Sequence, residues 1–223
     1  MDKKLIRDAM IKLCSGIVLM GLLLFLPAGT FAFPQAWLLM GVLFVPMFGA
    51  GIVMLVKSPE LLRKRLNAKE EQGEQKWVIA LSGLMFVAAF VLAGLNFRFG
   101  WHLLPAWVSI AAAVVFLLAY LLFAEVLREN AFLSRTIEVQ ENQKVVDTGL
   151  YGIVRHPMYA ATILLFLSMP LILGSLLSFA VMHLYLPIIG KRMRNEEAVL
   201  EAGLAGYKEY KQKVKYKVIP GIW

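Results

Sequence analysis

The sequence predicts an all-α polytopic membrane protein with four long transmembrane helices and a C-terminal helical hairpin, five to six spans in all. Three observations lead to this fold class. Hydrophobic residues make up 60% of the 223 residues, against roughly 45–50% in soluble domains. They gather in long uninterrupted runs. The Lys and Arg residues lie between these runs, in segments that alternate with them along the chain.

Four apolar runs are each about 20 residues or longer, which is enough to cross ~30 Å of hydrocarbon as a helix. They predict spans over residues 10–32, 35–56, 77–97 and 103–125. Small residues let transmembrane helices approach closely. In the second run we assign that role to three glycines, Gly41, Gly49 and Gly51.

Two shorter apolar runs, residues 157–172 and 174–190, predict the hairpin, which either forms two tilted spans or barely crosses the bilayer. A polar, basic tail follows. We expect its tyrosines, Tyr207 and Tyr210, to lie at the level of the lipid headgroups. The chain therefore divides into a scaffold domain, residues 1–125, and a core domain, residues 126–223.

Charge asymmetry predicts the orientation. With the N-terminus in the cytosol, 22 of the 23 Lys and Arg residues face the cytosol, and only Arg98 does not. This pattern satisfies the positive-inside rule and places both termini in the cytosol. The membrane is the plasma or inner membrane in a prokaryote and the endoplasmic reticulum in a eukaryote. The basic charge is explained by topology and by attraction to membrane lipids, so no nucleic-acid partner is expected, and no obligatory protein partner is evident.

Two polar clusters bracket the hairpin, GLYGIVRHPMY at residues 149–159 and KRMRNEE at residues 191–197. Proline is favoured in the first turn of a helix, so Pro157 is predicted to begin one. Arg155 and His156 then lie at a helix N-terminus, where backbone N–H groups and the helix dipole attract anions.

In the second cluster, Arg192 and Glu196 are spaced i,i+4 and share one helix face, with Glu197 beside them. This spacing is compatible with a surface ion pair or with a binding site. We predict no metal site, because the chain has one cysteine, and its histidines, His102, His156 and His183, are far apart in sequence.

Four segments, VVDTGLYGIVRHPMYAATI, RMRNEEAVL, GYKEY and VIPGIW, resemble the isoprenylcysteine carboxyl methyltransferase family of integral-membrane enzymes. The resemblance covers roughly residues 125–223. It implies a cytosolic pocket for S-adenosyl-L-methionine and a catalytic, substrate-facing role for Arg192. Arg155 and Glu197 are further candidates for substrate contacts. The cofactor contacts that it implies are Gln140, Gln143, Lys144, Val145, Val146, Tyr151, His156, Pro157, Met158, Tyr159 and Glu196.

The resemblance implies methyl transfer to a lipophilic acceptor that enters from the bilayer, with a carboxylate as the methyl-accepting group. A carboxylate with a pKa of about 4 is ionised at neutral pH and needs no general base. Related families share the RHP and EE pattern, so two alternatives stay open. One is a phospholipid N-methyltransferase, in which Glu196 or Glu197 would be a base. The other is an NADPH-dependent membrane reductase. Apart from these two enzymes, a non-catalytic membrane adaptor that keeps only the fold also stays open.

Overall fold

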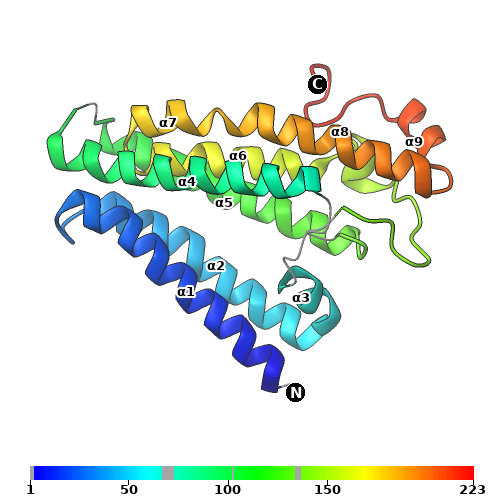
Figure 1. Ribbon diagram of the computed structural model, residues 1–223, viewed down its shortest axis with the longest axis horizontal. Coiled ribbons are helices and arrows are strands. Elements are labelled where there is room, and N and C mark those ends of the chain that lie inside the picture. Colours follow the sequence, from blue (N-terminus) through cyan, green and yellow to red (C-terminus); the bar gives the residue numbers. More distant parts are fainter. Residues whose placement is uncertain (1–2, 67–72, 102, 134–136) are drawn as a thin grey trace.

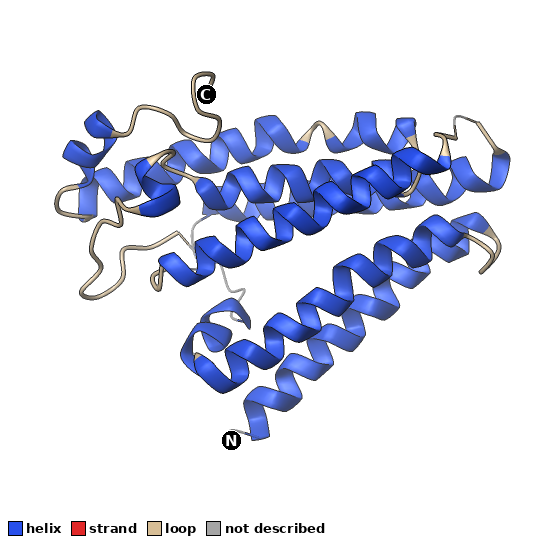
Figure 2. Cartoon of the chain, turned by 180° about the vertical axis from the view of Figure 1, so that it is seen from behind, coloured by secondary structure: helices blue, strands red, loops and turns tan. Residues whose placement is uncertain are grey.

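The computed structural model describes residues 3–66, 73–101, 103–133 and 137–223. These parts are helices and loops without a β-strand (Figure 2). An isolated bridge joins Leu103 to Ser175. The protein is all-α, as predicted.

Four of the described helices are long and apolar enough to cross a membrane: α1 (Lys3–Ala28), α2 (Pro34–Lys57), α4 (Gly73–Phe99) and α5 (Ala106–Glu129). This confirms the predicted polytopic class. The first helix is shifted from its predicted range of 10–32. It includes the charged N-terminal residues and ends before Gly29, which has a φ of 68° that favours glycine.

The helices α1 and α2 form an antiparallel pair that diverges from the rest of the bundle toward the N-terminus (Figure 1). At its other end the pair is held closely, because a Cβ on Gly94 of α4 would lie 2.6 Å from the carbonyl oxygen of Leu24. The expectation that Gly41, Gly49 and Gly51 allow a close helix approach was wrong, since a Cβ at these positions would meet nothing within 4 Å among the described residues.

The hairpin begins with α6 (Pro157–Ile172), in which Pro157 is the first helical residue, as predicted. Gly174, with a φ of 68°, turns the chain, and Ser175 caps the next helix, α7 (Leu176–Met182), by accepting a hydrogen bond from Ser178 N at 3.2 Å. At 16 residues, α6 is only about 24 Å long, less than the ~30 Å of a hydrocarbon core.

The second arm of the hairpin is broken at His183–Leu184, between α7 and α8 (Tyr185–Gly203). Pro187 explains the break, because it has no N–H for the carbonyl of His183 and its ring would clash with that carbonyl. The two helices follow one line along the bundle (Figure 1). The helix α8 continues through the second polar cluster, so residues 191–197 lie inside a helix and not at its end.

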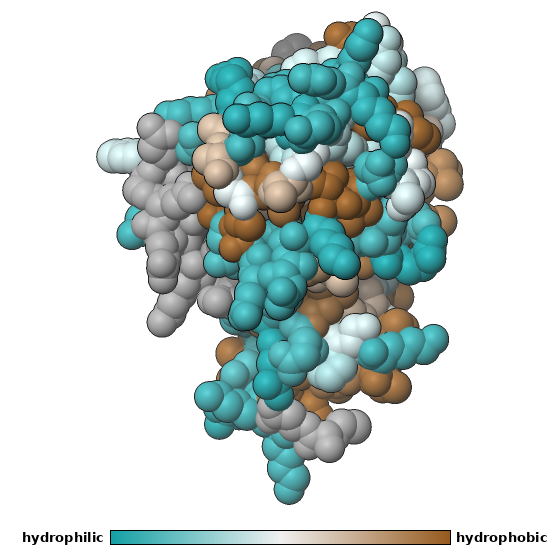
Figure 3. All heavy atoms as spheres, turned by 90° about the vertical axis from the view of Figure 1, so that its right-hand side faces the viewer, coloured by the Kyte–Doolittle hydropathy of each residue, from teal (hydrophilic) through white to brown (hydrophobic). Residues whose placement is uncertain are grey.

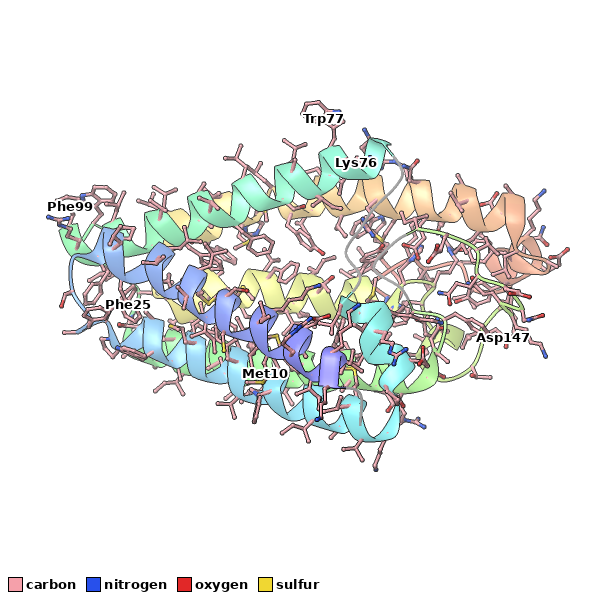
Figure 4. The ribbon with its side chains drawn as sticks, turned by 60° about the horizontal axis from the view of Figure 1, so that its bottom comes forward. Met10, Phe25, Lys76, Trp77, Phe99 and Asp147 are labelled. Carbon is pink, nitrogen blue, oxygen red and sulfur yellow. The ribbon has the colours of Figure 1, made fainter. Side chains whose placement is uncertain are left out.

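Three short elements gather at one end of the bundle, which we call the charged end: α3 (Pro59–Leu66), the 3-10 helix η1 (Gly149–Gly152) and α9 (Tyr207–Lys213). Hydrophilic residues cover much of this end, and hydrophobic residues show between them (Figure 3). Lys76 and Asp147 lie at the charged end and Phe25 and Phe99 at the opposite end (Figure 4).

The predicted division into residues 1–125 and 126–223 falls inside α5, about one turn before its end, and stays a prediction. The helices on its two sides pack directly, because α5 runs along α6 and α4 along α7.

Candidate functional site

A cavity opens at the charged end between the segment after α5, the start of α6, α8 and α9. Of the 14 site residues predicted from the sequence, 11 line it. They are Gln143, Lys144, Val145, Val146, Tyr151, Arg155, His156, Met158, Tyr159, Arg192 and Glu196. Segments more than 40 positions apart in the sequence thus meet around one space.

Three predicted residues do not line this cavity. Pro157 is fully buried as the first residue of α6. Gln140 is not a lining residue, and its Oε1 accepts a hydrogen bond from Lys64 Nζ at 2.7 Å. Glu197 is buried and does not line the cavity.

The two faces of α8 explain why its neighbouring glutamates differ. Tyr185, Ile189 and Met193 follow each other at i,i+4 spacing and are buried, and Glu197 comes one turn later on the same face. Glu196 lies on the adjacent face, which borders the cavity. One glutamate therefore faces the protein interior and the other faces the cavity.

Arg192 and Glu196 are linked through a residue of α6. Arg192 Nε donates a hydrogen bond to Tyr159 Oη at 3.2 Å, and the Tyr159 hydroxyl donates to Glu196 Oε2. Tyr159 is 3% exposed, so its ring is held in place by the packing of α6. The bridge places a guanidinium and a carboxylate side by side on the cavity wall.

Glu197 accepts hydrogen bonds from Arg155 Nε at 2.9 Å and Lys217 Nζ at 3.0 Å, and its Oε1 lies 3.1 Å from His156 Nε2. Lys211 Nζ is 3.8 Å from its other oxygen. Burial alone would raise the pKa of Glu197. The hydrogen bonds from His156, Arg155 and Lys217 outweigh burial and hold this pKa well below its usual range.

Arg155 also fixes the C-terminal segment. Its Nη1 donates to the carbonyls of Val214 at 2.6 Å and Lys215 at 2.7 Å, and its backbone N–H donates to Tyr216 O at 2.9 Å. Arg155, which was expected to bind an anion, thus uses two side-chain nitrogens, Nε and Nη1, in hydrogen bonds that hold the fold together. It still borders the cavity.

Glu129, at the end of α5, holds η1 in the cavity wall. Its carboxylate accepts from Leu150 N at 3.1 Å and from Thr148 Oγ1 at 3.2 Å. Gly149 has a φ of 50°, and a Cβ there would lie 2.0 Å from Glu129 Oε1, so this position requires glycine. The turn orients Tyr151, whose hydroxyl accepts from Asn130 Nδ2 at 3.0 Å. Burial raises the pKa of Tyr151 to about 12, so this hydroxyl stays protonated at neutral pH.

Tyr207 is a cavity residue that our sequence prediction missed. Its hydroxyl oxygen is buried and has no hydrogen-bond partner among the described residues, and its side chain lines the cavity. Burial, followed by the nearby charges of Glu197 and Glu196, raises the pKa of Tyr207 far above its usual value. The hydroxyl therefore keeps its proton and can donate a hydrogen bond to a bound molecule.

The expected headgroup-level position of Tyr207 and Tyr210 was wrong, because both are buried, at 4% and 6% exposure. A signal was present in the sequence. Leu204, Tyr207, Tyr210 and Val214 have helical spacing and form one apolar cluster.

In the parts of the chain that the structure describes, no group of three His, Cys, Asp or Glu side chains could hold a metal ion. His102 lies outside the described residues.

Two comparisons relate this chain to known proteins. Residues 107–202 match the sequence model of the isoprenylcysteine carboxyl methyltransferase (ICMT) family. The fold is similar to a solved structure of the eukaryotic intramembrane Ras methyltransferase ICMT. That match has a TM-score of 0.56 and 19% sequence identity, and it covers 92% of this chain and 74% of the other. No curated protein matches this sequence.

Proposed function

We propose that this chain, whose residues 107–202 match the sequence model of the ICMT family, transfers a methyl group from S-adenosyl-L-methionine to the carboxylate of a lipophilic acceptor. The observation that carries the proposal is the Arg192–Tyr159–Glu196 bridge on the cavity wall. It offers one cation for an acceptor carboxylate and one anion for a cationic cofactor group.

The residues of the cavity fit this cofactor, which when bound supplies a methyl group on a positively charged sulfur. The carboxylate of Glu196 is suited to the ammonium of the cofactor. Val145 and Val146 provide an apolar wall for its ring system. The Tyr207 hydroxyl, which has no partner among the described residues, supports the assignment independently, because an unsatisfied buried polar group is costly and a bound ligand would satisfy it.

Arg192 would bind and orient the acceptor. A terminal carboxyl has a pKa of about 3.5 and is ionised at neutral pH, so no residue has to remove a proton. The guanidinium can hold one carboxylate oxygen while the other forms the new bond to carbon. The cofactor would supply that carbon as the methyl group of its sulfonium and would leave as a neutral thioether. Opposite charges cancel in this step, so the exclusion of water favours it.

The distribution of charge supports a cytosolic position for this cavity. The charged end carries α3, η1 and α9, which belong to the predicted cytosolic segments, and residues of η1 and α9 line the cavity. The helix α4, with Arg98 in its last turn, ends on the opposite side (Figure 1). The positive-inside rule then orients both termini toward the cytosol. The acceptor's apolar part would come from the bilayer and the cofactor from the cytosol.

The test begins with cofactor binding. Protein purified into nanodiscs is titrated with S-adenosylhomocysteine by calorimetry, with NADPH as the competing ligand. We expect saturable binding of S-adenosylhomocysteine that NADPH does not displace. No binding at millimolar ligand, or displacement by NADPH, would count against a methyltransferase and for the reductase alternative.

The second step identifies the acceptor. Transfer of a labelled methyl group is measured to an S-isoprenyl cysteine with a free carboxylate, to its carboxamide and to phosphatidylethanolamine. We expect only the carboxylate to be methylated. Methylation of the amine instead would support the phospholipid N-methyltransferase alternative.

A further inference from the structure

A second, apolar groove lies between the diverging α1–α2 pair, α3 and α5, with about 420 Å³ of free volume. Ligand pockets in proteins typically measure about 300–1,000 Å³. Its walls include Met10, Met47 and Phe123, and Gly51 widens it by lacking a side chain. In the described parts of the chain, the groove shares no lining residue with the cavity at α6 and α8.

Two cationic side chains, Arg65 and Lys12, line this groove at the charged end. The guanidinium of Arg65 lies 5.2 Å from the centre of the Phe123 ring, and Lys12 Nζ donates to the carbonyl of Leu66. Arg65 is half-buried, whereas its neighbours Arg63 and Lys64 are exposed. No Asp or Glu is found among the described residues that line the groove. A guanidinium has five N–H donors, so Arg65 can keep its present contacts and still bind an oxygen anion.

We propose that this groove binds one anionic phospholipid, with its acyl chains between α2 and α5 and its phosphate against Arg65 and Lys12. An apolar groove with cations at one end is complementary to a lipid whose tails are apolar and whose headgroup is negative. The acceptor of the proposed reaction is a poorer candidate, because its carboxylate must reach Arg192, which lines the other cavity.

The lipid would also support the wall of the methyl-transfer cavity through α3. One side of α3 contributes Leu62 and Arg65 to the groove. From the same helix, Lys64 Nζ donates to Gln140 Oε1 at 2.7 Å. The backbone N–H of Gln140 donates to Gln143 Oε1 at 2.8 Å, and Gln143 lines the cavity. A lipid that keeps α3 in place would therefore also keep this part of the cavity wall in place. The effect of the lipid on the cavity rests on the proposed function.

Native mass spectrometry tests the lipid site without reference to activity. Delipidated protein is offered phosphatidylglycerol or phosphatidylcholine with the same acyl chains. We expect one phosphatidylglycerol to be retained in preference to phosphatidylcholine, and we expect Arg65→Gln to remove the preference. Arg63→Gln is the matched control, since it removes the same charge from the same helix outside the groove. Equal retention of the two lipids, or an equal loss in Arg63→Gln, would overturn the proposal.

The link to the cavity is tested by titrating S-adenosylhomocysteine into nanodiscs with and without phosphatidylglycerol. We expect about threefold tighter binding with the anionic lipid in the unmodified protein and in Arg63→Gln, and no gain in Arg65→Gln. Equal affinity in both nanodiscs would overturn the coupling through α3. An absence of binding in every nanodisc would contradict the proposed function, whereas the lipid preference is decided by mass spectrometry.

Discussion

Arg155 and Glu197 lie 42 positions apart in the sequence and are joined by a 2.9 Å hydrogen bond from Arg155 Nε to a carboxylate oxygen. Their side chains are only 4% and 5% exposed. The pair connects the start of α6 to the polar half of α8, the two elements that carry Tyr159 and Glu196. The geometry of the cavity therefore depends on this buried ion pair.

Glu197→Ala should destabilise the protein strongly. Removing one partner of a buried ion pair leaves the other charge uncompensated and typically costs about 3–5 kcal/mol. Glu201→Ala is a suitable control from the next turn of α8, because Glu201 pairs with Lys211 near the surface, where such pairs contribute at most about 1 kcal/mol. Thermal unfolding in detergent measures both. Equal effects of the two substitutions would show that the cluster around Glu197 is not a structural centre.

Stability should fall in acid because of the same residue. The pKa of Glu197 is depressed in the folded protein, whereas an unfolded chain has a glutamate pKa of about 4.3. The unfolded state thus binds a proton first as the pH decreases, so this stabilisation is complete above about pH 4.3 and is lost below it. Each pH unit below that value should cost up to about 1.4 kcal/mol from this group. Unfolding temperatures recorded between about pH 3 and 6 should show a steeper acid loss in the unmodified protein than in Glu197→Gln.

Much of the fold could be predicted because its signals are local. Long apolar runs and the distribution of charge predict the four spans, and Pro157 predicts the start of α6. The features that were predicted wrongly or not at all depend on how the helices pack. Gly94 and Gly41 look alike in sequence, but only Gly94 faces a neighbouring backbone. The break before α8 had a local cause in Pro187, which the apolar character of residues 174–190 obscured.

The candidate site could be predicted in part from its motifs, but the roles within it depend on three-dimensional contacts. Glu196 and Glu197 are adjacent in sequence, and only the direction of α8 shows which one borders the cavity. Tyr207 was assigned to the membrane surface because lysines surround it in sequence. Its burial results from the contact of α9 with the segment around Val139 and Val145.

Tyr207→Phe should weaken cofactor binding with little effect on stability. The substitution removes a hydroxyl that has no partner among the described residues, so the folded protein without cofactor loses no hydrogen bond there. One hydrogen bond contributes about 0.5–1.5 kcal/mol, and the dissociation constant of S-adenosylhomocysteine should therefore rise about 2- to 13-fold. Tyr210→Phe is the control, because the Tyr210 hydroxyl donates to Tyr151 O at 2.8 Å. It should reduce stability first, and unchanged affinity in Tyr207→Phe would remove Tyr207 from the site.

Gly94→Ala should disturb the contact between α1 and α4. The new Cβ would lie 2.6 Å from Leu24 O and 3.0 Å from Pro27 Cβ, so the two helices must separate, which typically costs about 1–3 kcal/mol. Gly41→Ala should be neutral or slightly stabilising, because a Cβ there meets nothing within 4 Å among the described residues and alanine favours the helix. Unfolding temperatures of the two variants in one detergent provide the comparison, and a Gly94→Ala protein as stable as Gly41→Ala would contradict the close contact.

Arg192→Lys should separate cofactor binding from methyl transfer. Lysine keeps the positive charge but lacks the planar, forked guanidinium that can hold a carboxylate with two parallel hydrogen bonds. It also removes the Nε that donates to Tyr159 Oη at 3.2 Å. Because small errors in the position of a reacting group cost about 100-fold in rate, we expect kcat to fall by about that factor. The dissociation constant of S-adenosylhomocysteine should change by no more than about twofold, since Glu196 stays in place. Single-turnover transfer and calorimetry measure the two quantities. If binding and turnover fall by the same factor, Arg192 acts through the cofactor and not through the acceptor.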